Sequence, residues 1–275
     1  MPSLAREPLP VPTQSSEFKA LSAGIRSGPG NAFLRSLLPD DLALVSQYLL
    51  PIQLYPNQLL HRQGEHPRPV IFPQSGLVSF SLPLQDGRSI AVAWLGCDSL
   101  IGAASATSGG PAIHDARVFV GGVGHQMPIP AFRSVLQQSP HVRRLVSQFE
   151  TLHWAHVQQT AVCNAAHGVE KRLCRLLLEI QDRTSDDCVT ITHERLAEML
   201  GVRRTTVSLI CESLQAAEVI YWRRGRMQIL CPDDLRRRSC ECYQCVLDCE
   251  RTIFAPRSPT LMNDSSAHQI NLEPA

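Results

Sequence analysis

Residues 190–230 contain the pattern that most restricts the fold of this chain. Thr192 belongs to the residue types that cap helices, and apolar residues follow it at helical spacing. Gly201 then interrupts the pattern where a left-handed backbone would end a helix. The apolar positions on either side of this glycine are Leu196, Leu200, Val207, Ile210 and Leu214. The spacing predicts two crossed helices joined by a tight turn.

The second of these helices begins with basic and hydroxyl side chains, and a basic hairpin follows it. Strand-like residues 219–222 and 227–230 flank an Arg-Arg-Gly-Arg turn, which predicts a two-stranded wing. Residues 201–238 hold eight arginines against four acids, whereas the whole chain has a net charge of +1. A helix presented in this way enters the major groove of DNA, and arginines suit the phosphate backbone. The predicted DNA contacts are Thr192, Arg203, Arg204, Thr205, Thr206, Ser208, Arg223, Arg224 and Arg226. A helical core with a solvated basic rim is the alternative.

The rest of the chain divides into tails, a strand-rich part and helices. The first 30 residues are rich in Pro, Ser and Gly, so we expect a disordered tail there and a second one from near Pro256. Between them, short apolar segments separated by Gly, Pro and Asp favour a small antiparallel barrel or roll, with a hairpin turn at Asp86-Gly87. We find neither a signal sequence nor a membrane-length apolar run, and therefore expect a cytoplasmic protein without membrane contact.

Within residues 139–167, mostly apolar side chains recur at alternating spacings of three and four residues, which is typical of a heptad seam. The pattern predicts a long helix that pairs with its copy in a homodimer. Packing of the helix on its own roll is the alternative, and Val146, His153 and Val157 would serve it. The predicted dimer seam consists of Leu145, Phe149, Leu152, His156, Gln159 and Cys163.

The order of these parts resembles the Crp/Fnr family of bacterial transcription regulators over about residues 33 to 245. The segments that match are LHRQGE at 60–65, FPQSG at 72–76, GCDSLIG at 96–102 and LAEMLGVRRTTV at 196–207. The ending SCECY at 239–243 looks like one branch of the family.

The resemblance implies an α+β protein with five segments and a homodimer on a palindromic promoter site in double-stranded DNA. The segments are a tail (1–30), a cyclic-nucleotide-binding-like β-roll (31–138), a long dimerisation helix (139–167), a winged helix-turn-helix (168–238) and a Cys-rich segment with a disordered tail (239–275). A signal in the roll would pass through the long helix, and an activator would contact RNA polymerase. Arg204 matches the family's major-groove arginine, which suits guanine. Thr205 and Leu209 depart from its common Glu and Arg, so the target sequence does not carry over.

The residues that hold a cyclic nucleotide in this family are replaced here. The family's Gly-Glu pair reads Gly102-Ala103, and its Arg-Ser/Thr-Ala triplet reads His114-Asp115-Ala116. Losing a charge-assisted contact to the phosphate is costly, so we expect no tight binding of cyclic AMP. The N-terminal cysteines of the oxygen-sensing branch are also missing, since Cys97 is the first cysteine.

Four of the ten cysteines gather near the C-terminus. Cys240, Cys242, Cys245 and Cys249 could form a tetrahedral zinc or iron–sulfur site, although one short segment would have to wrap around the ion. Reduced thiols, a reversible disulfide and a metal bridged between protomers are the alternatives. We interpret Cys163, Cys174, Cys188, Cys211 and Cys231 as small buried hydrophobic residues. His153 and His156 could ligate a haem or titrate, but a structural role is favoured.

These patterns predict a DNA-binding transcription regulator and no enzyme. Paired carboxylates, a nucleophile elbow and a phosphate loop are absent from the sequence, and the adjacent pair His114-Asp115 is a weak signal. The alternative is a redox- or metal-responsive regulator that uses the C-terminal cysteines. A storage module whose head no longer binds DNA is a third hypothesis, against which the basic wing argues.

Overall fold

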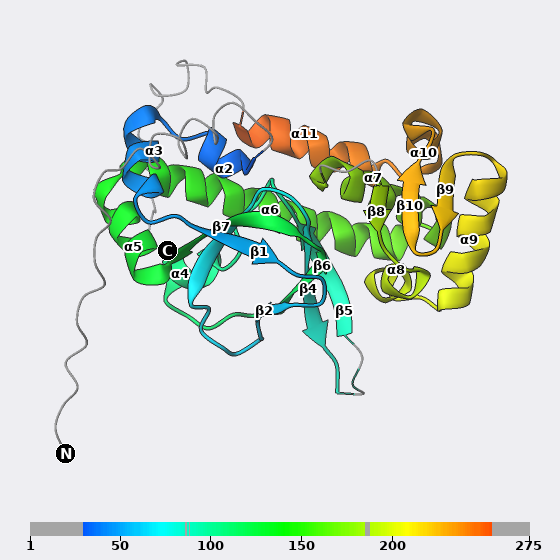
Figure 1. Ribbon diagram of the computed structural model, residues 1–275, viewed down its shortest axis with the longest axis horizontal. Helices are drawn as coiled ribbons and strands as arrows, with labels where there is room; N and C mark the ends of the chain where they lie inside the picture. Colours follow the sequence, from blue (N-terminus) through cyan, green and yellow to red (C-terminus); the bar gives the residue numbers. More distant parts are fainter. Residues whose placement is uncertain (1–29, 86, 88, 185–187, 255–275) are drawn as a thin grey trace, which may run out of the picture.

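The computed structural model describes residues 30–254 except 86, 88 and 185–187. Both predicted tails therefore lie outside the described residues, apart from Gly30. Figure 1 shows a strand-rich part beneath a long helix, with a smaller helical head at one end. None of the helices in the described part is both long and apolar enough to cross a membrane.

The strand-rich part is a roll of two antiparallel sheets. One has the order β1-β7-β3 and the other β2-β6-β4-β5. Strands β4 and β5 pair as the predicted hairpin, while Asp86 of its turn lies outside the described residues. The strands are β1 (Leu50–Leu54), β2 (Leu59–His61), β3 (Pro69–Pro73), β4 (Leu77–Pro83), β5 (Ser89–Leu95), β6 (Asp115–Val120) and β7 (Gly122–Pro128). The short helices around them are α2 (Ala32–Arg35), α3 (Pro39–Ser46), α4 (Ala103–Ser108) and α5 (Ile129–Gln138).

The predicted long helix is α6 (Pro140–Ala166), which begins where the Ser139 hydroxyl accepts the Val142 amide. Its predicted dimer seam is wrong, because the protomer itself covers those side chains. Phe149 is only 5% exposed and lies 5.6 Å from the ring of Phe33 and 4.7 Å from that of Phe254. The other buried seam residues are Leu145, Leu152, His156 and Cys163, and Gln159 is half-buried. A heptad-like stripe arises equally when a helix packs on its own roll, which was the alternative.

A further helix, α11 (Cys242–Phe254), lies alongside α6 (Figure 1). The Cys-rich segment is therefore ordered through Phe254, and its apolar face covers part of α6. The amide of Gln148 on α6 donates to the carbonyl of Ile253 at 2.9 Å. The Tyr243 hydroxyl donates to Asp182 at 2.8 Å, which fixes the start of α11 against the head.

The head contains the predicted helix-turn-helix. Thr192 caps α8 (His193–Leu200) by accepting the Arg195 amide, and Gly201 ends it with φ of 66°. The second helix is α9 (Arg204–Ala216), and the wing strands are β9 (Ile220–Arg223) and β10 (Arg226–Ile229). The wing sheet has a third strand, β8 (Cys188–Thr190), that the sequence did not predict. Helices α7 (Val169–Arg183) and α10 (Pro232–Arg238) complete the head.

Head and roll share one hydrophobic core. Trp94 and Phe119 of the roll belong to the same buried cluster as Leu177 and Leu196 of the head. The guanidinium of Arg195 also lies 4.7 Å from the centre of the Phe119 ring.

Candidate DNA interface, sensor pocket and thiol cluster

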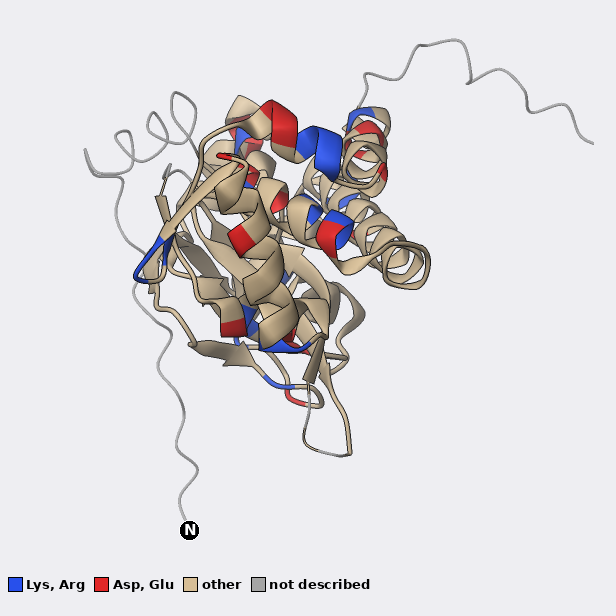
Figure 2. Ribbon diagram, turned by 90° about the vertical axis from the view of Figure 1, so that its right-hand side faces the viewer, with Lys and Arg blue, Asp and Glu red and all other residues tan. Residues whose placement is uncertain are grey.

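The predicted DNA-contacting arginines lie on the exposed surface of the head. Arg203 and Arg204 stand at the start of α9, and both are exposed together with Thr205. Arg224 and Gly225 at the wing tip have φ of 52° and 74°, the left-handed pair that a tight hairpin turn requires. Figure 2 faces this end of the molecule and shows its basic and acidic segments.

Five of the predicted contact arginines have no acidic partner in the part of the chain that the structure describes. Among the described residues, no acidic side chain forms an ion pair with Arg203, Arg204, Arg223, Arg224 or Arg226. By contrast, the arginines of α10 pair with Asp233, Asp234 and Glu170. The start of α9 and the wing tip are therefore the sites available for phosphates and base edges.

Three of the predicted contact residues have side chains that are half-buried or already hydrogen-bonded within the head. The Thr192 hydroxyl is used as the cap of α8, and Thr206 is half-buried. Ser208 is half-buried too, with its hydroxyl 3.0 Å from Nδ1 of His193. The His193 ring lies 4.4 Å from the Trp222 ring, so this contact links α8, α9 and the wing. Ser208 thus orients the helix-turn-helix.

The roll has a small pocket where a cyclic nucleotide would be expected. Three histidines line it with Phe80, whose ring stacks on His114 at 3.7 Å. Burial, together with nearby His61 and His153, lowers the pKa of His114 to about 3, and burial lowers that of His153 to about 4. These side chains are therefore neutral at pH 7.

The family's phosphate-binding arginine is absent from this pocket, and no nearby arginine among the described residues takes its place. Arg117 donates to the carbonyl of Asn57 at 3.0 Å and does not line this pocket. Asp115 accepts the Gln63 amide at 2.8 Å, and Glu150 adds an acidic group to the pocket wall. His156 lies outside the pocket, although His153 lines it, and Nε2 of both lacks a hydrogen-bond partner among the described residues.

A buried charge network joins the roll to α7. Arg183 is 6% exposed and contacts Asp98 at 2.7 Å and Glu179 at 3.5 Å. Glu179 also pairs with Arg175 at 2.8 Å and accepts a hydrogen bond from the Trp94 indole. The side chain of Arg183 runs across Gly96, where an added Cβ would lie 2.7 Å from it. This close approach explains the glycine before the Cys-Asp pair of the roll.

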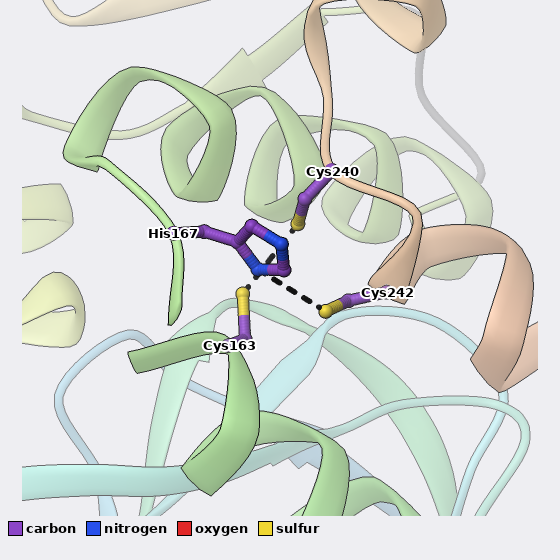
Figure 3. Close-up of side chains that lie close together, drawn as sticks. All are labelled: Cys163, His167, Cys240 and Cys242. Atoms are coloured by element: carbon purple, nitrogen blue, oxygen red, sulfur yellow. Dashed lines mark hydrogen bonds between the residues drawn. The ribbon is translucent and has the colours of Figure 1, made fainter. Parts of the chain in front are cut away.

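The predicted four-cysteine site does not form among the described residues. The structure instead brings Cys240 and Cys242 together with Cys163 and His167 from the end of α6, and the ligand atoms of all four lie within 4.8 Å of one another (Figure 3). Cys245 is exposed, and together with Cys249 it lines a groove against α6. Cys245 and Cys249 lie three and seven residues beyond Cys242 on α11, about one and two helical turns further along the axis and thus farther from Cys240.

The contribution of α6 to this cluster is absent from the sequence predictions. They treat Cys163 as a small buried hydrophobic residue and His167 as part of a helix break. The spacing of these residues, Cys-x3-His at a helix end, was the available signal, because residues four apart share a helical face. Of the other cysteines interpreted as buried, Cys174 and Cys211 are buried, whereas Cys188 and Cys231 are half-buried.

Comparisons with known proteins agree with this architecture. The Crp-like helix-turn-helix domain family matches residues 171–238, while no curated protein matches the sequence. FixK2 from Bradyrhizobium japonicum superposes with a TM-score of 0.61 at 14% identity, covering 70% of this chain and 98% of that one. A CRP-family transcriptional regulator from Thermus thermophilus gives 0.57 at 20% identity, covering 68% and 96%. The c-di-GMP responsive global regulator CLP from Xanthomonas campestris gives 0.55 at 14%, covering 69% and 98%.

This chain shares with these solved structures a fold in which a β-roll, a long helix and a winged helix-turn-helix follow one another. Residues 171–238 are a Crp-like helix-turn-helix domain, and the chain has the fold of CRP/FNR-family transcriptional regulators. The resemblance predicted from the sequence is thereby confirmed.

Proposed function

We propose that this protein is a transcription regulator that binds a palindromic promoter site in double-stranded DNA as a homodimer. The observation that carries the proposal is a set of five exposed arginines at the start of α9 and on the wing of a Crp-like domain, none of which has an ion-pair partner among the described residues. Such a regulator acts on the chromosome in the cytoplasm, and an activator would also contact RNA polymerase. No catalytic activity is proposed.

Replacing Arg204 by alanine tests the proposed reading of DNA. We expect affinity for a duplex selected by the wild-type protein to fall about 5- to 150-fold, because one bidentate base contact is lost. Preference should relax at one base pair in each half-site. Fluorescence anisotropy on matched and mismatched duplexes measures both effects.

Arg236→Ala is the matched control, because Arg236 is already paired with Asp233 on α10. An equal loss of affinity on every duplex would make Arg204 a phosphate contact. Phosphate contacts release counterions, so DNA affinity should fall as the salt concentration rises. A wild-type affinity that does not change with salt would refute DNA binding by this head.

The proposed homodimer requires a face of α6 other than the predicted seam. Trp154 and Val162 on α6 are 62% and 55% exposed. Further exposed residues continue this stripe at spacings of three and four: Thr151, Gln158, Ala161 and Ala165. A large aromatic side chain among small residues suits close packing of two helices.

Trp154→Glu should convert the dimer to a monomer, because it places a carboxylate against its symmetry mate. Sedimentation equilibrium measures the mass. Tyr55→Glu on the roll is the control, as Tyr55 is a comparably exposed aromatic residue at 64%. A Trp154 variant that stays dimeric would exclude this face.

We infer that the roll does not sense a cyclic nucleotide. The neutral histidines and Glu150 of its pocket offer no positive charge to a phosphate, which supports this inference. The alternative from the sequence, a redox- or metal-responsive regulator, draws support from the thiol cluster, with Cys163 and His167 in place of Cys245 and Cys249.

A further inference from the structure

We propose that Cys163, His167, Cys240 and Cys242 bind one zinc ion, which fastens the C-terminal helix α11 to the joint between α6 and α7. The four residues come from two segments, the end of α6 with its cap His167, and the start of α11 with Cys240 just before it (Figure 3). The sequence offers each segment as a pair, Cys-x3-His and Cys-x-Cys. Two ligand pairs on separate segments are the common plan of structural zinc sites.

The distances in the cluster fit a tetrahedral ion. With Zn–S of about 2.3 Å and Zn–N of about 2.0–2.1 Å, tetrahedral angles place two sulfurs about 3.8 Å apart and a nitrogen and a sulfur about 3.6 Å apart. The Sγ atoms of Cys163 and Cys240 lie 3.5 Å apart. Nδ1 of His167 lies 3.5 Å from Sγ of Cys242. All four ligand atoms lie within 4.8 Å of one another, so small side-chain shifts would bring them to zinc distance.

The imidazole of His167 is held in the orientation that a ligand needs. Its Nδ1 faces the thiols, while its Nε2 lies 3.1 Å from the carboxylate of Glu241, the residue between the two later cysteines. A carboxylate that accepts the outer N–H of a metal-bound histidine is a recurrent arrangement around zinc. The amide of Gln159 also donates to Sγ of Cys242 at 3.0 Å, a contact that favours a thiolate.

The surroundings suit a structural ion. All three cysteines are buried, so four protein ligands would close the site to water. Three thiolates and Zn²⁺ leave one negative charge, and the buried guanidinium of Arg175 lies beside Cys163 to balance it. A disulfide between Cys163 and Cys240 would leave His167 and Cys242 without a role. A two-iron cluster would spread its ligands around two centres, whereas these atoms surround one.

The ion would act at the junction between α6 and α7. His167 ends α6 and Gly168 begins the turn into α7, with nothing within 4 Å of an added Cβ there. Zinc would tie this junction to Cys240, two residues after the end of α10 in the head. The site would therefore fix the angle between the long helix and the head, whichever DNA the head binds.

The full-length protein, purified under anaerobic conditions without chelators, provides the test. Elemental analysis should find one zinc per chain, and zinc-edge X-ray absorption should show three sulfur ligands and one nitrogen. Cys242→Ser should lose the zinc, and Cys245→Ser, an exposed thiol three residues further on the same helix, should keep it. Iron in place of zinc, metal-free protein with a Cys163–Cys240 disulfide, or an oxygen-rich zinc shell would overturn the proposal.

A second variant, at Glu241, leaves all three thiols in place, so its result can be interpreted even if the cysteine variants do not fold. Glu241 is 71% exposed, so Glu241→Ala should leave the fold intact yet weaken zinc binding by about 10- to 100-fold in competition with a chromophoric chelator. An unchanged affinity would remove the carboxylate from the proposal. Removing zinc from the wild type should also raise hydrogen exchange in residues 163–168 and in α11, and unchanged exchange would refute the fastening role.

Discussion

Arg183→Ala should lower the free energy of unfolding by about 3–5 kcal/mol, because it leaves the Asp98 carboxylate without its partner and Glu179 with Arg175 alone. Burial alone would raise the pKa of Asp98, but the charge of Arg183 outweighs it and lowers that pKa to about 2. Urea denaturation at pH 7 measures the loss. Since the unfolded value is about 3.9, the contribution is complete above that pH and disappears as the pH falls through 2.

Arg251→Ala on α11 is the control for this experiment. Arg251 and its partner Asp248 are 72% and 57% exposed, so their pair should contribute about 0–1 kcal/mol. The double variant Arg183→Met with Asp98→Asn should recover part of the stability, because it removes both charges of this pair while Glu179 keeps Arg175. A loss for Arg183→Ala no larger than for Arg251→Ala would show that the network is not desolvated.

Mild acid should unfold the protein through its buried histidines. Burial lowers the pKa of His114 and His156 to about 3 and that of His153 to about 4, whereas an unfolded histidine titrates near 6.5. Below about pH 6.5 the unfolded chain binds protons that the folded chain does not bind, so stability falls as pH falls. Each histidine contributes at most about 1.4 kcal/mol per pH unit, and the three together at most about 4.

His114→Phe isolates one of these histidines. It keeps a ring stacked on Phe80 but cannot take a proton, so the dependence of unfolding free energy on pH between 4 and 6.5 should become shallower by up to about 1.4 kcal/mol per unit. The comparison uses urea denaturation at each pH with zinc present throughout. An identical slope in the variant would show that His114 is accessible to protons in the folded state.

The structural features that the sequence predicted correctly are those formed by residues close together in the chain. The cap at Thr192, the left-handed Gly201 and the hairpin turn at Arg224-Gly225 each involve neighbours in the chain, and the structure has all three. The prediction of a dimer seam on α6 was wrong because a stripe of apolar residues indicates that a helix face is buried, but not which part of the molecule buries it. Here the cover is the roll and α11, whose Phe254 meets Phe149 across 105 residues of sequence.

Only half of the thiol cluster could be predicted from the sequence, because its two pairs of residues are far apart in the chain. Cys240 and Cys242 can be recognised because they lie close in sequence, but their partners are on α6, about 75 residues earlier. Only the packing of α11 along α6 brings the two pairs together. The third strand of the wing sheet, β8, was missed for a simpler reason, since three residues give too short a pattern to show alternation.

The hydrophobic cluster that contains Trp94 and Phe119 of the roll as well as Leu177 and Leu196 of the head makes these two parts one cooperative unit. A calorimetric scan should then contain a single transition, and limited proteolysis should not release an intact head. Any small molecule that binds only the roll would raise the melting temperature of the helix-turn-helix by the same amount. Information about an occupied roll would thus reach the DNA-contacting helices as shared stability, even without a visible movement.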